Sequence, residues 1–199
     1  GIKKEDHVIL YAHPGSVGGP RVWYLFNAFQ HEKVSLINGG LDAWVQEGGK
    51  VESSTAMPSP VSAEKLTGGG YIGAKLLKEV VANKGDVLQA LNSGIAQILD
   101  ARSSQRFTGQ VAEPRAGLVS GSIPGSLNLP FTELLENGDT TRFKSKGEIR
   151  DVLRASGVIF GAKCISTCGS GLTAAYAAMG ASIIGRPFTD MPIYDGSWT

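Results

Sequence analysis

Excess charge, cysteine and long hydrophobic runs are all scarce in this sequence. Its 199 residues include 19 Lys and Arg and 18 Asp and Glu, which gives a net charge of +1. Proteins that hold nucleic acid usually carry a basic excess, so we expect no nucleic-acid partner. The longest apolar stretch, 174–185, is shorter than the roughly 18 residues of a membrane span, so we expect no membrane partner either. Two cysteines are too few for a disulfide scaffold.

Glycine, in contrast, is abundant. The chain has 27 glycines, about twice the usual frequency, and 42% of its residues are hydrophobic. This composition predicts a globular chain with many tight turns. The first residue is Gly1 rather than Met, and we interpret the chain as a trimmed polypeptide.

The first fifty residues have the pattern of a βαβ unit. The apolar run 8–11 predicts a buried strand, and Pro20 suits the first turn of a helix that we expect to run through 21–26 towards His31. A second strand is predicted over 34–37, followed by a short helix over 41–47. A strand, helix and strand at this spacing indicate a parallel sheet.

After a segment of different composition, predicted strands and helices alternate again in the rest of the chain. Ser, Thr, Pro and Gly dominate residues 50–70 and predict a linker. Segment 75–82 is ambiguous between strand and helix. Beyond it we expect strands over 95–99, 163–167 and 191–194, and helices over 85–92 (capped by Asn83), 131–135, 148–155 and 173–184.

The two ends of the chain have the order of elements expected of an internal duplication. Strand, glycine-rich loop, helix, strand and turn occur over 8–40 and again over 164–196. Ala12 in the first copy corresponds to Cys168 in the second. Only the second copy therefore keeps a thiol.

Cys168 opens the segment Cys-Gly-Ser-Gly-Leu-Thr between a predicted strand and a predicted helix. Gly169 and Gly171 tolerate positive φ, so the backbone N–H groups of this loop can surround an anion. These dipoles and the helix N-terminus favour thiolate over thiol, which predicts a reactive sulfur. The alternative is that Cys168 is a small buried hydrophobic residue at the end of a strand.

Three other interpretations of this region are weaker. A cysteine phosphatase needs an arginine six residues after the cysteine, and Ala174 stands there. The loop also fits the glycine fingerprint of dinucleotide-binding folds, with Asp190 about 20 residues on, but a lone fingerprint is weak. A disulfide with Cys164 would have to span roughly 13 Å of strand, so we expect Cys164 to lie in the core.

Several motifs in family order resemble the 3-mercaptopyruvate sulfurtransferases, which are two-domain members of the rhodanese superfamily. In the second half these are Leu-Asp-Ala-Arg-Ser (99–103), Arg-Phe-x-Gly (106–109), Glu-Pro-Arg (113–115), Ile-Pro-Gly-Ser-Leu-Asn-Leu-Pro-Phe (123–131), the Cys168 loop and Tyr-Asp-Gly-Ser-Trp (194–198). In the first half, Pro-Arg-Val-Trp (20–23), Phe29 and Asn-Gly-Gly (38–40) resemble the catalytically silent domain. The resemblance implies an α/β, rhodanese-like fold with a parallel sheet flanked by helices.

The resemblance also implies tandem domains, of which the N-terminal one is incomplete. We expect a remnant of the silent domain over 1–49, the linker over 50–70 and the catalytic domain over 71–199. The sequence before Val8 holds no counterpart of residues 95–160, and Ser122 stands where relatives often have His. These departures favour a fragment, and they make a non-catalytic binding or regulatory module the second hypothesis beside an enzyme.

In this family a cysteine thiolate takes sulfur from 3-mercaptopyruvate, releases pyruvate and becomes a persulfide. A second thiol such as reduced thioredoxin then removes the outer sulfur, and no metal or organic cofactor takes part. The resemblance makes Cys168 the nucleophile and Ser170 a proton relay. Arg106 and Arg115 match the arginines that hold the substrate carboxylate. The cradle around the transferred sulfur is assigned to Gly169, Ser170, Gly171, Leu172 and Thr173.

Loop composition indicates the donor. Relatives that prefer thiosulfate carry basic residues directly after the cysteine, whereas Gly169 and Ser170 add no charge. We therefore expect 3-mercaptopyruvate, with thiosulfate as the alternative donor. Asp100 and Arg102 are expected to form a structural ion pair, and Trp198 to wall the site or to pack. Few cysteines and a reactive thiol suit a cytoplasmic or mitochondrial location.

Overall fold

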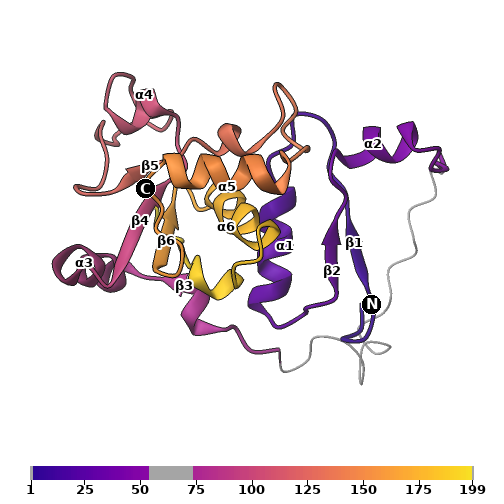
Figure 1. The fold of residues 1–199 in the computed structure, drawn as a ribbon, viewed down its shortest axis with the longest axis horizontal. Coiled ribbons are helices and arrows are strands. Elements are labelled where there is room, and N and C mark those ends of the chain that lie inside the picture. The colour runs from indigo at the N-terminus through magenta and orange to yellow at the C-terminus, as the bar shows by residue number, and fades with distance from the viewer. Residues whose placement is uncertain (1, 54–73, 199) are drawn as a thin grey trace.

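The structure is a computed structural model that describes residues 2–53 and 74–198 (Figure 1). The predicted linker over 50–70 lies outside the described residues from residue 54 onward. No helix in the described part of the chain combines the length and the apolar character needed to cross a membrane.

The larger sheet has five strands in the order β3-β7-β6-β4-β5, and all of its pairings are parallel. The strands are β3 (Val81–Ala82), β4 (Ala96–Asp100), β5 (Leu127–Asn128), β6 (Lys163–Thr167) and β7 (Ile193–Tyr194). β4 and β6 pair over five residues, from Ala96 opposite Lys163 to Asp100 opposite Thr167. Their carboxyl ends therefore meet at one edge of the sheet.

The predicted strands of this sheet are confirmed with small changes of boundary. The strand expected over 163–167 has those bounds, the one over 95–99 is shifted by one residue, and the one over 191–194 is shortened to Ile193–Tyr194. The ambiguous segment 75–82 forms a 3-10 turn, η2 (Lys78–Val80), followed by β3.

The helices that accompany this sheet are α3 (Lys84–Ser93), α4 (Ser104–Phe107), α5 (Lys146–Ala155) and α6 (Ala174–Ile183), with the 3-10 turns η3 (Phe131–Leu134) and η4 (Phe188–Asp190). The helix expected over 131–135 is wrong in type, since residues 131–134 form the single 3-10 turn η3. The predicted cap of α3 is confirmed. The side chain of Asn83 accepts hydrogen bonds from the backbone N–H groups of Gly85 (2.6 Å) and Asp86 (3.2 Å).

The N-terminal residues form the predicted βαβ unit, with parallel strands β1 (Val8–Leu10) and β2 (Val34–Leu36) joined by α1 (Gly19–Ala28). α2 (Gly40–Gln46) follows. The helix expected through 21–26 is confirmed, and it stops three residues before His31. The helix ends at Ala28, and Gln30 then adopts a left-handed backbone conformation with φ of 64°, which a right-handed helix cannot contain.

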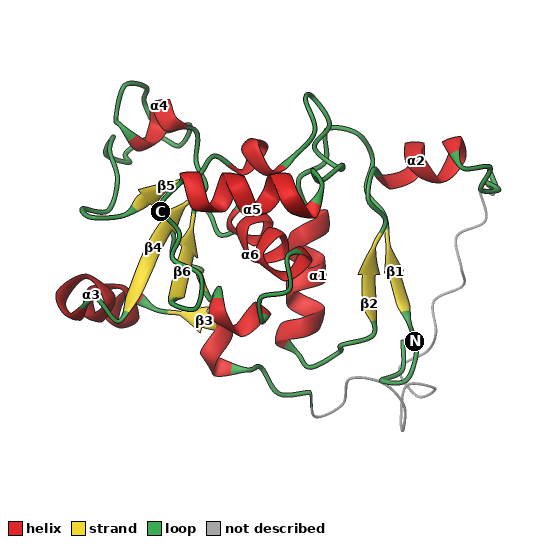
Figure 2. Cartoon of the chain, viewed as in Figure 1, coloured by secondary structure: helices red, strands yellow, loops and turns green. Residues whose placement is uncertain are grey.

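The helices α1, α5 and α6 lie between the two sheets (Figure 2). Residues 174–181 of α6 are all buried, and most of them are alanine or glycine. Small side chains let neighbouring helices and strands approach α6 closely on every side. Trp23 and Tyr24 of α1 belong to the same hydrophobic cluster as Leu99 of β4 and Tyr176 of α6. One core therefore joins the N-terminal unit to the larger sheet.

Candidate functional site

Cys168 lies where the carboxyl ends of β4 and β6 meet. It follows β6 directly, and the backbone N–H of Ala101 donates to the carbonyl of Thr167 (2.8 Å), so the chain after β4 passes beside it. Ligands of open parallel sheets bind at this carboxyl edge. The position of Cys168 is thus set by the register of the two central strands.

Backbone N–H groups hold Cys168 at its sulfur and at its carbonyl. The backbone N–H of Ser170 donates to Sγ of Cys168 at 3.5 Å, and the backbone N–H of Trp198 donates to the Cys168 carbonyl at 3.1 Å. Cys168 is buried but lines a pocket, whereas Cys164 is fully buried in the core, as predicted. Burial raises the pKa of the Cys164 thiol to about 12, which makes it inert at neutral pH.

The pocket beside Cys168 has a volume of about 200 Å³. Its lining residues are Arg106, Glu113, Pro114, Arg115, Leu118, Cys168, Gly169, Ser170, Leu172 and Thr173. The fold thus brings seven of the eight predicted site residues to one cavity. Gly171 is the exception, because it does not line the pocket.

Gly171 instead lets the loop pass close to another segment. Its φ is +78°, and a Cβ there would lie 2.7 Å from Oδ1 of Asp195. Arg21 of α1 donates from Nη2 to Asp195 Oδ1 (2.7 Å) and from Nη1 to the Gly171 carbonyl (3.4 Å). No local pattern in the sequence points to Arg21 beyond its place in a family motif, because its partners lie 150 and 174 residues away.

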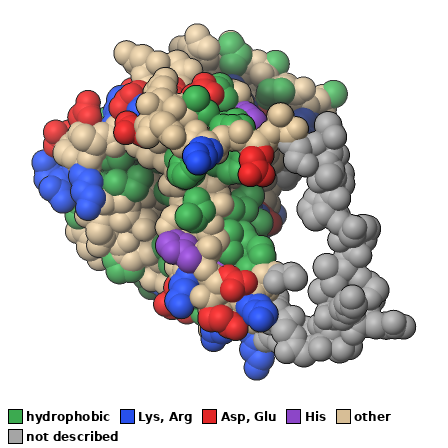
Figure 3. Space-filling model, turned by 90° about the vertical axis from the view of Figure 1, so that its right-hand side faces the viewer, with side chains coloured by type: hydrophobic (Ala, Val, Ile, Leu, Met, Phe, Trp, Pro, Cys, Tyr) green, Lys and Arg blue, Asp and Glu red, His purple; other side chains and the backbone are tan. Residues whose placement is uncertain are grey.

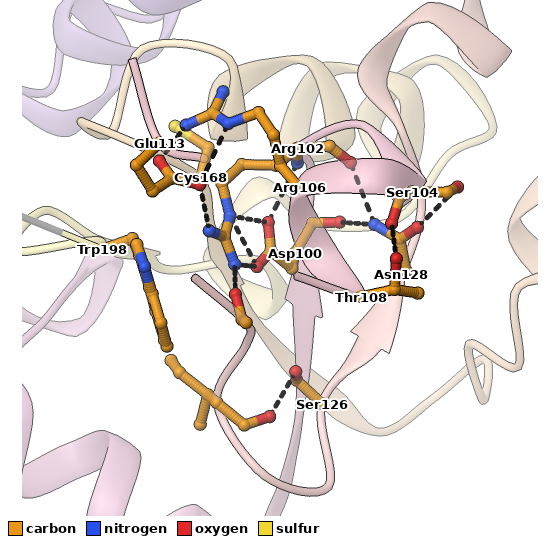
Figure 4. A network of polar contacts seen from close by, with 12 residues as sticks. Asp100, Arg102, Ser104, Arg106, Thr108, Glu113, Ser126, Asn128, Cys168 and Trp198 are labelled. Atoms are coloured by element: carbon orange, nitrogen blue, oxygen red, sulfur yellow. Dashed lines mark hydrogen bonds and ion pairs between the residues drawn. The ribbon is translucent and has the colours of Figure 1, made fainter. Parts of the chain in front are cut away.

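Arg106 lies over the cysteine loop, next to Cys168 (Figure 4). A Cβ on Gly169 would approach Nη2 of Arg106 to 2.7 Å, so the absence of a side chain at 169 makes room for this guanidinium. Glu113 holds Arg106 through two contacts, Nε to Oε1 at 3.1 Å and Nη2 to Oε2 at 2.5 Å. Glu113 belongs to the Glu-Pro-Arg motif, but the sequence alone did not predict a role for it.

A buried ion network lies behind the pocket (Figure 4). Arg102, whose side chain has no exposed surface, contacts Asp100 through Nη2 and Oδ2 at 2.6 Å and Glu113 through Nη1 and Oε1 at 2.8 Å. The expected Asp100–Arg102 ion pair is therefore present. The ring of Trp198 stacks on Arg102 at 4.6 Å and donates from Nε1 to the Val119 carbonyl, so this Trp packs on the network and is not among the lining residues.

The network keeps Glu113 and Arg102 ionised. The hydrogen bond from Arg106, together with the charges of Arg106 and Arg102, holds the pKa of Glu113 below its usual range although burial opposes this. Burial also opposes the charge of Arg102, but hydrogen bonds and charge from Asp100 and Glu113 raise its pKa. Glu113 is thus a carboxylate at neutral pH, even beside a buried thiol.

Two other cavities among the described residues lack such chemistry. One of about 450 Å³ lies against the outer side of α1 and is lined by Val22, Leu25, Phe26, Phe29 and Ala74. Another of about 340 Å³ lies beside the exposed side chains of Ile9 and Tyr11, on a face where hydrophobic side chains gather (Figure 3). Neither is lined by cysteine or arginine. Within the described ranges, no three His, Cys, Asp or Glu side chains cluster as metal ligands.

Comparison with known proteins supports the same reading of the fold. No family model matches the chain. The 3-mercaptopyruvate sulfurtransferase of Homo sapiens is 36% identical over 200 residues, which cover 100% of this chain and 63% of the relative. The thiosulfate sulfurtransferase of Bos taurus is 38% identical over 202 residues, with the same two coverages. The chain thus spans about 63% of the length of these curated relatives.

Among solved structures, the crystal structure of a 3-mercaptopyruvate sulfotransferase from Escherichia coli, described as having the "rhodanese" fold, is similar to this chain with a TM-score of 0.78. The two are 33% identical, and the match covers 100% of this chain and 69% of that one. The predicted fold class, α/β with a parallel sheet flanked by helices, is confirmed.

Proposed function

Since the chain belongs to the rhodanese family of sulfurtransferases, we propose that it moves sulfur from 3-mercaptopyruvate to a thiol acceptor through a persulfide on Cys168. The observation that carries this proposal is that Cys168 and two arginines line one cavity of about 200 Å³. A volume of this size suits a small acid rather than a peptide or a nucleotide. The thiol supplies a nucleophile, and the arginines supply charge for a carboxylate.

The sulfur transfer is a two-step covalent reaction. The thiolate of Cys168 attacks the donor sulfur and forms an S–S bond while the C–S bond of 3-mercaptopyruvate breaks. The electron pair of that bond stays on carbon, so pyruvate leaves as its enolate and then takes up a proton. The donor sulfur keeps its hydrogen, which leaves Cys–S–SH. An acceptor thiolate such as that of reduced thioredoxin attacks the outer sulfur, takes it, and regenerates the Cys168 thiolate.

The loop residues orient these steps. The N–H of Ser170, which donates to Cys168 Sγ, stabilises negative charge on the nucleophile, and its hydroxyl relays a proton to the departing enolate. Gly169, Leu172 and Thr173 line the space that the transferred sulfur enters. Gly171 contributes through its backbone conformation, which keeps the loop closed.

The two arginines have different surroundings. Arg106 is held in place by Glu113, lines the cavity and keeps N–H groups on Nη1 and Nη2 that Glu113 does not take. Arg115 is exposed, and the described residues form no ion pair with it. We assign the main contact with the donor carboxylate to Arg115, supported by Arg106. No cofactor is needed for this chemistry.

Thiosulfate is a second candidate donor, because a thiosulfate sulfurtransferase is 38% identical to this chain. A non-catalytic binding module is the remaining alternative. In that case Cys168 would occupy the same loop without accepting sulfur.

The proposal is tested by incubating the chain with 3-mercaptopyruvate and a reducing thiol. We expect pyruvate in the presence of the thiol, and a mass increase of one sulfur atom on Cys168 in its absence. Cys168→Ser removes both signals because the hydroxyl is not a comparable nucleophile, whereas Cys164→Ala, in the core, keeps them. If the unaltered chain forms neither pyruvate nor persulfide, it is a module rather than an enzyme.

A further inference from the structure

We propose that Glu113 sets the charge of the Cys168 pocket to suit a donor with one negative charge, and so disfavours a donor with two. The inference rests on the proposed function, because it concerns the donor that this same site accepts. It assigns a specificity role to a side chain that is neither the nucleophile nor one of the arginines.

Glu113 occupies a position from which it can control the pocket charge. It lines the cavity although only 1% of its side chain is exposed, so its carboxylate is shielded from bulk water. Oε1 accepts from Arg102 Nη1 (2.8 Å) and Arg106 Nε (3.1 Å), and Oε2 accepts from Arg106 Nη2 (2.5 Å). Interactions between charges are stronger in such a partly dry site than at a surface.

The charges at this edge of the sheet nearly cancel. Arg102, Arg106 and Arg115 bring three positive charges, while Asp100 and Glu113 bring two negative ones. The Cys168 thiolate of the proposed mechanism adds a third negative charge, so the site is close to neutral before a donor enters. 3-Mercaptopyruvate adds one negative charge, that of its carboxylate, while its thiol is protonated. Thiosulfate adds two negative charges, which is more costly in a shielded site.

Geometry limits what Arg106 can offer a donor. Glu113 occupies the Nε–Nη2 edge of its guanidinium, so a donor is left with the remaining N–H groups of Nη1 and Nη2, on a cation whose charge is already paired with Glu113.

The test compares donors in Glu113→Gln, which removes the charge and keeps the shape. We expect the ratio of kcat/KM for thiosulfate to kcat/KM for 3-mercaptopyruvate to rise about tenfold, since one unit charge is lost at contact distance from Arg106 in a partly shielded site. Glu113→Asp keeps the charge, so its donor ratio stays near that of the unaltered chain even if both rates fall. Glu47→Gln, at the end of α2 on the far side of the molecule, matches the change in net charge and leaves the ratio unchanged (Figure 1).

A measurement on the unaltered chain tests the same inference without a variant. Glycolate and oxalate are similar in size but carry one and two charges, and we expect oxalate to inhibit pyruvate formation no more strongly than glycolate. Stronger inhibition by oxalate, or an unchanged donor ratio in folded Glu113→Gln, overturns the inference while the proposed function stands. Failure of the unaltered chain to form pyruvate or persulfide refutes the proposed function instead.

Discussion

At the scale of single residues, the missing side chain of Gly169 leaves room for the guanidinium of Arg106. The guanidinium of Arg106 occupies the space that a side chain at 169 would take. Arg106 is fixed by two contacts with Glu113, so it cannot move away without losing them. The glycine directly after Cys168 is therefore coupled to the placement of a charge in the pocket.

We expect Gly169→Ala to raise KM for 3-mercaptopyruvate about tenfold, the cost of weakening one charged hydrogen bond to the donor. The added methyl group displaces Arg106 Nη2, but Cys168 keeps its hydrogen bond from Ser170, so kcat falls less than KM rises. Steady-state kinetics measure both constants. Gly147→Ala in α5 is the matched control, since a Cβ there meets its nearest neighbour only at 4.0 Å. A purely kcat effect would contradict this placement of Arg106.

At the scale of elements, local patterns predicted those parts of the fold that depend on neighbours in the sequence. The apolar runs identified β1, β2 and β6, and the Asn83 cap identified the start of α3. The two-residue strand β5 and the single-turn helix α4 were missed, because so few residues show no periodicity.

The same distinction applies to the site. The glycine-rich loop and the motifs nearby were visible as sequence, and the resemblance drew attention to both arginines. The roles of Glu113 and Arg21 depend on contacts that the fold creates, with Arg21 reaching a loop 150 residues away. Contacts between residues so far apart in the chain cannot be predicted from local sequence patterns.

The link from α1 to the cysteine loop leads to a prediction about reactivity. Arg21 donates to the Gly171 carbonyl and pairs with Asp195, so Arg21→Ala removes two constraints on the loop. Asp195 is half exposed, and we expect the free energy of unfolding to fall by only about 0.5 kcal/mol. The rate of Cys168 alkylation by iodoacetamide should nevertheless rise several-fold, because the loop opens more often.

Arg21→Lys separates a general charge effect from this geometry. Lysine keeps the charge but cannot reach two acceptors with a rigid fork, so we expect an alkylation rate between those of the unaltered chain and Arg21→Ala. Equal alkylation rates in all three proteins would show that α1 does not restrain the loop.

At the scale of the whole molecule, the two sheets are joined through the helices between them. The hydroxyl of Tyr24 in α1 donates to the carbonyl of Val80 at 2.6 Å and contacts that of Met191 at 3.2 Å. Burial raises the pKa of Tyr24 above its ordinary range, so the hydroxyl stays a donor. The bond links the N-terminal unit to the segments that flank β3 and β7.

We expect Tyr24→Phe to lower the free energy of unfolding by about 1–3 kcal/mol, because it leaves a buried carbonyl without its donor while keeping the ring in the core. Urea unfolding followed by circular dichroism measures the change. Tyr11→Phe is the control, because Tyr11 is 58% exposed and its loss of a hydroxyl leaves no buried group unpaired. A loss as small as that of the control would mean that water replaces Tyr24 at these carbonyls.

The shared core also decides how the chain unfolds. A βαβ unit of about 50 residues buries too little surface to be stable alone, and here its helix contributes Trp23 and Tyr24 to the cluster that contains the larger sheet. We therefore expect residues 2–49 and 74–198 to unfold in a single transition.

Two tryptophan variants can follow the two parts separately in urea. One keeps only Trp23, which reports on the first part, and the other keeps only Trp198, which reports on the second; the remaining tryptophans are replaced by Phe. Within each variant, fluorescence and circular dichroism should give the same midpoint. An earlier fluorescence transition in the Trp23 variant alone would mean that the N-terminal unit folds onto an already stable C-terminal part, and that Cys168 can keep its pocket without it.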